Sequence, residues 1–264
     1  MTVTAASGVA KKAPLTFELD HGFAARGAIG LIVLSSDQTI EHELRQWLGI
    51  EGVALYQSRI RNDSRITPET LKAMEARITE ATDVILPGVA LDVVAFACTS
   101  ASMVIGEERV FERIREARPE VKTTTPITAV FAALDALQAK RIALLTPYRD
   151  DVNQQIRRYI EARGVKVPAM ASFEEEDDRH VCRISEASIK AAAIELGQAS
   201  DVEAVVISCT ALRTRGVIGE IETALEKPVT SSNHALGWHC LRLAGIDERC
   251  ERAGRLYQLD LPEA

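Results

Sequence analysis

Two stretches of the chain share one pattern: Val93-Val-Ala-Phe-Ala-Cys98-Thr99 and Ala204-Val-Val-Ile-Ser-Cys209-Thr210. Each is a short apolar run without alternation that ends in Cys-Thr. A continuous apolar run is typical of a strand covered on both faces, as in a parallel sheet. In open parallel sheets, ligands bind at the carboxyl ends of the strands. The repeated pattern therefore predicts two similar α/β lobes, each with one cysteine at the end of a strand.

Further apolar runs alternate with amphipathic stretches along the rest of the chain, which indicates βαβ crossovers. Strands are expected over 28–34, 53–57, 93–97, 141–146, 165–169, 204–208 and 228–231. One helix is expected to begin at Pro68, with Thr67 as its N-cap. Others are expected over 107–117, 127–139, 150–163, 185–199, 216–226 and 235–244, with Gly164 as a C-terminal cap. The fold class is α/β: two pseudo-symmetric lobes, each with a short, mostly parallel sheet flanked by helices, and an active site in the cleft between them.

The predicted division of the chain follows the two cysteines. Lobe 1 comprises residues 27–123 and 230–264 and contains Cys98, whereas lobe 2 comprises residues 124–229 and contains Cys209. Residues 1–26 form an N-terminal extension, which lacks the apolar core of a secretory signal.

Composition excludes several classes of protein. With 31 basic and 38 acidic residues, the net charge is −7, which argues against nucleic-acid or membrane-surface partners. The longest apolar stretch, residues 84–106, is interrupted by Pro87, Gly88 and Asp92, so no membrane span is expected. Five cysteines in a chain of 264 residues fit a reducing compartment, and a cytoplasmic location is expected. Neither a metal-ligand cluster nor a nucleotide-binding signature is present, so no metal and no cofactor are expected.

The position of the two cysteines suggests a chemical role. Backbone N–H groups at the start of a following helix lower the pKa of a thiol and can hold an anion. Two such thiols facing each other across a cleft could remove a proton from one side of a carbon atom and return it on the other. The alternative is that Cys98 and Cys209 are small buried apolar residues, the commonest role of free cysteine.

Five motifs occur in order at compatible spacing: residues 30–41, Cys98-Thr99-Ser100, Leu145-Thr146-Pro147-Tyr148, Ser208-Cys209-Thr210 and Ala253-Gly254-Arg255-Leu256. With them, the chain after about Gly27 resembles the aspartate/glutamate racemase superfamily, particularly the branch of maleate cis–trans isomerases and arylmalonate decarboxylases.

This resemblance implies roles for individual residues. Cys98 and Cys209 would be the catalytic pair. The decarboxylases have glycine at the first position, so the presence of Cys98 argues against simple decarboxylation. Tyr148 would hydrogen-bond the substrate, or else pack as an ordinary tyrosine at a strand end. The hydroxyl and N–H groups expected to hold a substrate carboxylate belong to Ser35, Ser36, Thr99, Ser100 and Thr210.

Two departures from the maleate isomerases affect the expected substrate. Asp37 and Asp178 stand where those enzymes have asparagine. A carboxylate about 4 Å from a substrate carboxylate costs about 4 kcal/mol at intermediate dielectric. A substrate with a cationic group is therefore favoured over a dianion, and Asp37-Gln-Thr-Ile-Glu41 looks like ectoine-utilisation relatives, whose substrates are cyclic amidine carboxylates. Alternatively, Asp37 only caps a helix that begins near Thr39.

The favoured hypothesis is a cofactor-independent, two-cysteine racemase, epimerase or cis–trans isomerase. It would act next to the carboxylate of a small, zwitterionic, amino-acid-type substrate, in a homodimer or homotetramer, and the resemblance points to ectoine or hydroxyectoine catabolism. Alternatives are a maleate isomerase, an arylmalonate-type decarboxylase, and a non-catalytic protein that binds a small molecule.

Overall fold

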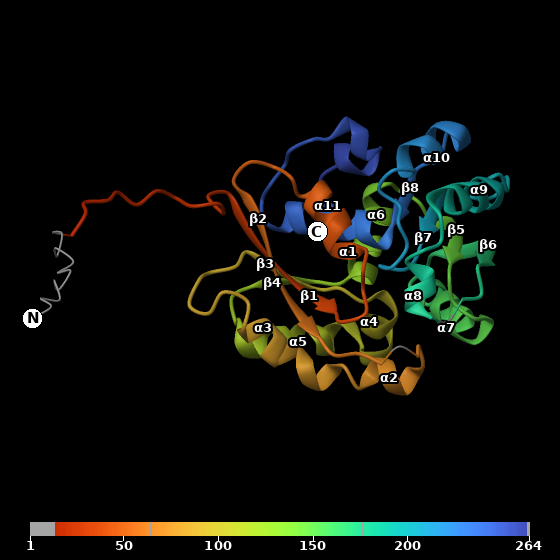
Figure 1. The fold of residues 1–264 in the computed structure, drawn as a ribbon. Helices are drawn as coiled ribbons and strands as arrows, with labels where there is room; N and C mark the ends of the chain where they lie inside the picture. Colours follow the sequence, from red (N-terminus) through yellow and green to blue (C-terminus); the bar gives the residue numbers. More distant parts are fainter. Residues whose placement is uncertain (1–13, 64, 176, 263–264) are drawn as a thin grey trace, which may run out of the picture.

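The protein contains two parallel sheets of four strands each (Figure 1). The computed structural model describes residues 14–63, 65–175 and 177–262. The first sheet has the order β2-β1-β3-β4, and the second has the order β6-β5-β7-β8. The strands of the first are β1 (Gly27–Leu34), β2 (Val53–Ile60), β3 (Val93–Phe96) and β4 (Lys122–Thr124). Those of the second are β5 (Arg141–Thr146), β6 (Lys166–Ser172), β7 (Ala204–Ile207) and β8 (Val229–Ser231). The predicted two-lobed α/β fold is confirmed.

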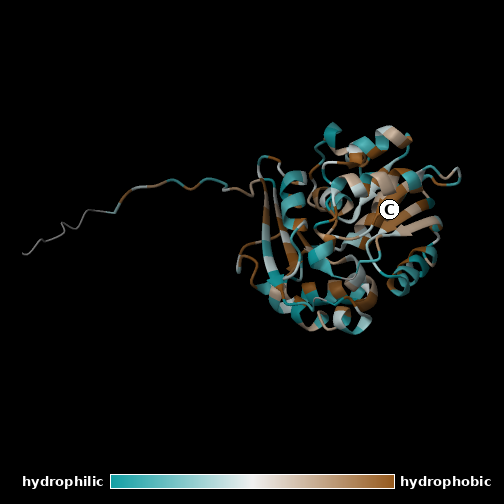
Figure 2. Ribbon diagram, turned by 45° about the vertical axis from the view of Figure 1, so that its right-hand side comes forward, coloured by the Kyte–Doolittle hydropathy of each residue, from teal (hydrophilic) through white to brown (hydrophobic). Residues whose placement is uncertain are grey.

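Helices cover both sheets, and Figure 2 shows hydrophobic residues concentrated on the strands that they enclose. Those connecting strands of lobe 1 are α1 (Ile40–Trp47), α2 (Pro68–Lys72), α3 (Ile78–Asp83), α4 (Thr99–Ile105) and α5 (Glu107–Ala117), with a short 3₁₀ helix, η1 (Glu75–Arg77). In lobe 2 they are α7 (Asp150–Glu161), α8 (Asp178–Val181), α9 (Glu186–Gly197) and α10 (Ile218–Leu225). Helices α6 (Pro126–Ala136) and α11 (Ser232–Leu243) pack against each other between the lobes, and η2 (Glu251–Ala253) and η3 (Leu256–Gln258) follow.

The apolar runs that predicted the fold are the central strands. Strands β1, β3 and β7 are buried over their whole length, as expected for strands covered on both faces. Thr67 caps α2, and Gly164, with φ of 83°, follows α7 as predicted.

Several boundaries differ from the predictions. Strand β4 was not expected, because Lys122-Thr-Thr is too short and polar to stand out as a strand. The helix expected from Pro68 is divided into α2, η1 and α3. Strand β2 continues to Ile60 rather than ending at Gln57. Because β2 lies at the edge of its sheet, it can include polar residues that would not occur within a buried strand. The lobe limits at 27–123, 124–229 and 230–264 remain a prediction.

The two lobes are joined by a buried carboxylate. Glu43 of α1 accepts hydrogen bonds from the backbone N–H groups of Thr214 and Arg215 in lobe 2. It also accepts from the Thr214 hydroxyl at 3.2 Å and from the amide of Asn233, on α11, at 2.8 Å. A buried carboxylate needs such compensation, so these contacts fix α1 against lobe 2.

Residues 14–26 precede the first strand, and part of the expected N-terminal extension, residues 1–13, lies outside the described residues. Residues 14–26 contain neither a helix nor a strand, and they project away from lobe 1 (Figure 1). Within the described part of the chain, no helix has the length and apolar character needed to cross a bilayer.

Candidate active site

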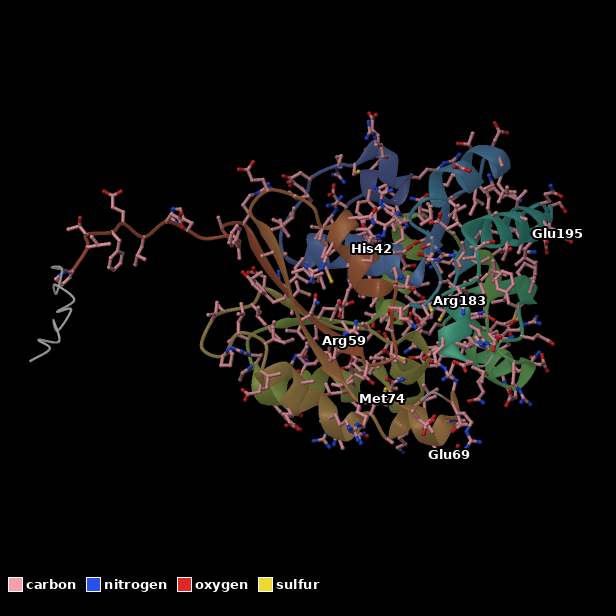
Figure 3. The ribbon with its side chains drawn as sticks, viewed as in Figure 1. His42, Arg59, Glu69, Met74, Arg183 and Glu195 are labelled. Carbon is pink, nitrogen blue, oxygen red and sulfur yellow. The ribbon has the colours of Figure 1, made fainter. Side chains whose placement is uncertain are left out.

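Both predicted catalytic thiols open onto one pocket between the lobes. Cys98 follows β3 in lobe 1, and Cys209 follows β7 in lobe 2. The pocket is small, with a cavity volume of about 30 Å³. Among the lining residues, Met74 is labelled in Figure 3. The structure therefore brings together two cysteines that are far apart in the sequence.

Cys98 is the N-cap of helix α4. Its sulfur accepts a hydrogen bond from the backbone N–H of Ala101 at 3.4 Å and lies 3.7 Å from the hydroxyl of Ser100. The chain turns into the helix at once, so the thiol lies at the positive end of the helix dipole.

Cys209 has different surroundings. Its sulfur accepts from the N–H of Ala211 at 3.4 Å and is hydrogen-bonded by the hydroxyl of buried Tyr148. The next helix, α10, begins only at Ile218, so this thiol lacks the helix start that the sequence predicted. Tyr148 replaces that helix start as the nearby hydrogen-bond donor.

The thiol pKa values are raised, whereas the sequence analysis expected them to be lowered. Burial raises the pKa of Cys98 to about 12 and that of Cys209 well above its usual range. The carboxylates of Asp178 and Asp37 raise both pKa values further. The backbone N–H and hydroxyl donors act in the other direction but do not outweigh burial.

Asp37 lines the pocket and also caps α1. One of its oxygens accepts from the N–H groups of Thr39 and Ile40 at 2.7 and 2.9 Å, and the hydroxyl of Thr210 donates to the same carboxylate. Burial raises the pKa of Asp37 to about 6 despite these donors. The predicted capping contact is thus present, and the same carboxylate also lines the pocket.

Asp178, the first residue of α8, belongs to a chain of hydrogen bonds across the lobes. It accepts from the hydroxyl of Ser36 at 2.9 Å, and the Ser36 oxygen in turn accepts from the amide of Asn62 at 2.8 Å. Burial raises the pKa of Asp178. Ser36 and Asn62 therefore orient a carboxylate that faces both thiols.

Eight of the ten residues predicted for the site line the pocket: Asp37, Cys98, Thr99, Ser100, Tyr148, Asp178, Cys209 and Thr210. Ser35 does not, because its side chain is exposed and donates to Asn62 at 2.9 Å. Ser36 is outside the lining too and acts on Asp178. That these two hydroxyls hold a substrate carboxylate therefore stays a prediction.

Asn62 and Arg65, which were not predicted from the sequence, also line the pocket. Both follow β2, whose carboxyl end was predicted at Gln57 rather than at Ile60, so the polar residues after Ile60 did not stand out as lying at a strand end. Arg65 is the one cationic side chain among the described residues of the lining. Its backbone pairs with that of Asp177, so loops of both lobes meet at the pocket. No group of three metal-ligating side chains occurs in the described residues.

Comparison with known proteins places this site in a family. The sequence matches the arylmalonate decarboxylase family over residues 38–257. A maleate isomerase of Nocardia farcinica is 30% identical, with 88% of this chain and 96% of the relative covered. An arylmalonate decarboxylase of Bordetella bronchiseptica is 32% identical over 51% of this chain and 57% of the relative.

Solved structures agree with the sequence relatives. The maleate cis–trans isomerase of Nocardia farcinica bound to TRIS has a TM-score of 0.81 at 28% identity, covering 88% of this chain and 98% of the other. A cysteine-to-serine variant of that enzyme, which matches equally well, contains a covalently bound succinylcysteine intermediate. Unliganded arylmalonate decarboxylase has a TM-score of 0.74 at 26% identity, covering 88% and 98%. The chain thus belongs to the arylmalonate decarboxylase family, whose relatives include maleate isomerases.

Proposed function

We propose that the protein is a cofactor-independent cis–trans isomerase of a small unsaturated carboxylate. The observation that carries this proposal is that Cys98 and Cys209, from different lobes, open onto one small pocket. The relatives named as maleate isomerases, and the succinylcysteine found in one of them, support a covalent role for a cysteine.

The proposed reaction uses one thiolate and one thiol. The Cys98 sulfur, as thiolate, adds to one carbon of the double bond, and the neighbouring carbon takes a proton from Cys209. The new single bond rotates. Cys209 then removes the proton, the carbon–sulfur bond breaks, and the trans isomer leaves with both cysteines in their initial states. Cys98 is assigned the nucleophilic role because it is the N-cap of α4, where the helix start favours a thiolate.

A specific observation favours a second candidate, racemisation or epimerisation of a zwitterionic substrate. Asp37 and Asp178 face the pocket as carboxylates, and both raise the pKa values of the thiols. An ammonium or amidinium group between these carboxylates would be attracted by them and would ease ionisation of a thiol. In this reaction one thiolate removes the proton next to the carboxylate, and the other thiol returns one on the opposite face.

A decarboxylase is the third candidate, and the role of Cys98 separates it from the other two. In an isomerase or racemase of this type, Cys98→Ser stops turnover. In an arylmalonate-type decarboxylase, only Cys209 is required.

The experiment incubates wild type, Cys98→Ser and Cys209→Ser in deuterated water with maleate, with monoanionic unsaturated acids, with zwitterionic amino-acid derivatives and with arylmalonates. Proton NMR follows isomerisation and deuterium incorporation, and intact-protein mass spectrometry detects adducts. Cys250→Ser, which replaces an exposed thiol, is the matched control.

The main proposal predicts a trans product with wild type and Cys250→Ser, and an adduct of substrate mass on Cys98 in Cys209→Ser. Deuterium exchange next to the carboxylate without isomerisation would instead establish the racemase candidate. Release of CO₂ that survives Cys98→Ser would establish the decarboxylase. If no substrate is turned over or exchanged, the protein is a binding protein and the enzymatic proposals are wrong.

Two further properties are proposed with this function. Chemistry that needs two free thiols favours a reducing compartment, and the five cysteines are free in the structure, which supports a cytoplasmic location. Exposed apolar side chains near the N-terminus support a homo-oligomer.

A further inference from the structure

The segment of residues 14–26, here called the arm, exposes large apolar side chains. Leu15, Phe17, Leu19 and Phe23 are 85%, 81%, 89% and 90% exposed. Elsewhere in the described residues, the only exposed large apolar side chains are Val84 and Val89, which are 57% and 51% exposed. Such a concentration of exposed apolar surface on one segment marks an interaction site rather than ordinary surface.

The arm has the pattern of a β-strand. Leu15, Phe17 and Leu19 alternate with the polar residues Thr16 and Glu18, so an extended arm presents one apolar face. Figure 1 shows it extended and directed away from lobe 1. A single extended segment gains little by itself, because a strand is stabilised by pairing with a neighbour.

Strand β2 offers such a neighbour. It is an edge strand, and no other strand of the described residues pairs with its outer side. The carbonyls of Gly52 and Ile60 accept hydrogen bonds from residues at the two ends of β1. Since backbone groups alternate along a strand, those of Leu55, Gln57 and Arg59 face the unpaired edge. A strand of eight residues with an open edge is a template for pairing with another chain.

Position, length and charge match the arm to this edge. The arm leaves the body beside β2, because the N–H of Arg26 bonds to the carbonyl of Gly52 at 2.8 Å. Residues 15–23 of the arm span about 30 Å when extended, which is close to the length of the eight-residue strand β2. Glu18 of the arm is negatively charged. The positively charged guanidinium of Arg45 lies beside β2, where it donates a hydrogen bond to the side-chain oxygen of Gln57 at 2.8 Å.

We propose that the arm of each subunit pairs with the outer edge of β2 in a second copy of the chain, in a two-fold, arm-exchanged dimer. A two-fold axis beside the start of β2 brings each arm to the other subunit's edge, so the contact is self-complementary. Pairing satisfies the outward backbone groups of Leu55, Gln57 and Arg59 and covers the apolar face of the arm. This assembly does not depend on the reaction proposed above.

The test is analytical ultracentrifugation of the full chain and of four variants. Phe17→Asp places a charge on the apolar face of the arm, and Thr16→Asp places the same charge on its polar face. Gln57→Pro removes an outward N–H of β2 without removing a bond to β1, and Gln57→Ala controls for the loss of the side chain. Circular dichroism checks that each variant is folded.

Wild type, Thr16→Asp and Gln57→Ala are expected to be dimers with similar dissociation constants. Phe17→Asp and Gln57→Pro are each expected to weaken the dimer at least about tenfold.

The proposal is overturned by a wild type that stays monomeric at about 100 µM, or by dimers that neither Phe17→Asp nor Gln57→Pro weakens. If Gln57→Pro does not fold, the Phe17→Asp and Thr16→Asp pair decides alone.

Discussion

Cys98 and Cys209 follow strands β3 and β7 with the same sequence pattern, but their surroundings differ. Cys98 caps α4 and takes its hydrogen bond from the first turn of that helix. Cys209 precedes a loop, and Tyr148 and Ala211 provide its hydrogen bonds. Burial raises both pKa values, to about 12 for Cys98 and further for Cys209.

This difference shows that a duplicated lobe need not give duplicated chemistry. The helix start favours negative charge on Cys98, whereas Asp178 is the largest influence after burial on the pKa of Cys209 and opposes its ionisation. One thiol is therefore suited to act as the nucleophile and the other to hold a proton. Variants of the two thiols, of Asp178 and of Tyr148 test this asymmetry.

Replacing the thiols should give the largest effect. Cys98→Ser should lower kcat/KM on the order of 10⁴-fold, and Cys209→Ser about 10²- to 10³-fold, because loss of the nucleophile removes the covalent route entirely. Steady-state kinetics measures both losses, with the substrate that the NMR experiment in deuterated water identifies. Equal losses in the two variants would contradict the asymmetry.

Asp37 should make stability depend on pH. Its pKa, raised from 3.8 to about 6, means that the folded state binds this proton more tightly than the unfolded chain. The corresponding stability is fully present below about pH 4 and is lost as the pH rises through 6. The loss amounts to about 3 kcal/mol at 1.36 kcal/mol per pKa unit.

Asp37→Asn can still cap α1 through its side-chain oxygen but carries no charge. Its free energy of unfolding in urea, relative to wild type, should therefore rise by about 3 kcal/mol between pH 4 and pH 8. A difference that stays the same at both pH values would show that Asp37 is not the titrating group.

Asp178→Asn should change the two thiols unequally. Removing the carboxylate lowers the pKa of both, and that of Cys209 more, because Asp178 is a larger influence there. Iodoacetamide labelling at pH 8, followed by peptide mass spectrometry, should show a severalfold faster reaction of Cys209 and a smaller gain for Cys98. The amide still accepts from Ser36, so the hydrogen-bond chain remains. A larger gain at Cys98 would reverse the assignment.

Tyr148→Phe should have the smallest effect, confined to lobe 2. It removes the hydroxyl that bonds to Cys209, so the pKa of this thiol should rise while that of Cys98 stays nearly unchanged. The pH dependence of alkylation, measured separately in Cys98→Ser and Cys209→Ser backgrounds, gives both values. An equal shift of both thiols would indicate a general change of the pocket instead.

The sequence predicted the fold where burial determines the residue types. Continuous apolar runs identified β1, β3, β5 and β7, and the Cys-Thr pattern identified the site. Polar segments were harder: Lys122–Thr124 forms a strand only because β3 provides a partner. Asn62 was not predicted for a related reason: an edge strand contains polar residues, so its composition does not indicate where the strand ends.

The expected direction of the thiol pKa shift failed for another reason. A local rule about helix starts cannot anticipate how deeply a side chain is buried or which carboxylates from the other lobe approach it. Asp178 reaches the thiols only because Ser36 and Asn62 orient it, and this contact joins residues that are distant in the sequence.

The buried carboxylate of Glu43 also bears on how the site is held together. Hinging the lobes apart would strip this carboxylate of its donors on Thr214 and Arg215 and leave it with the amide of Asn233 alone. The contacts at Glu43 therefore oppose separation of the lobes, which holds Cys98 and Cys209 on the two sides of one pocket.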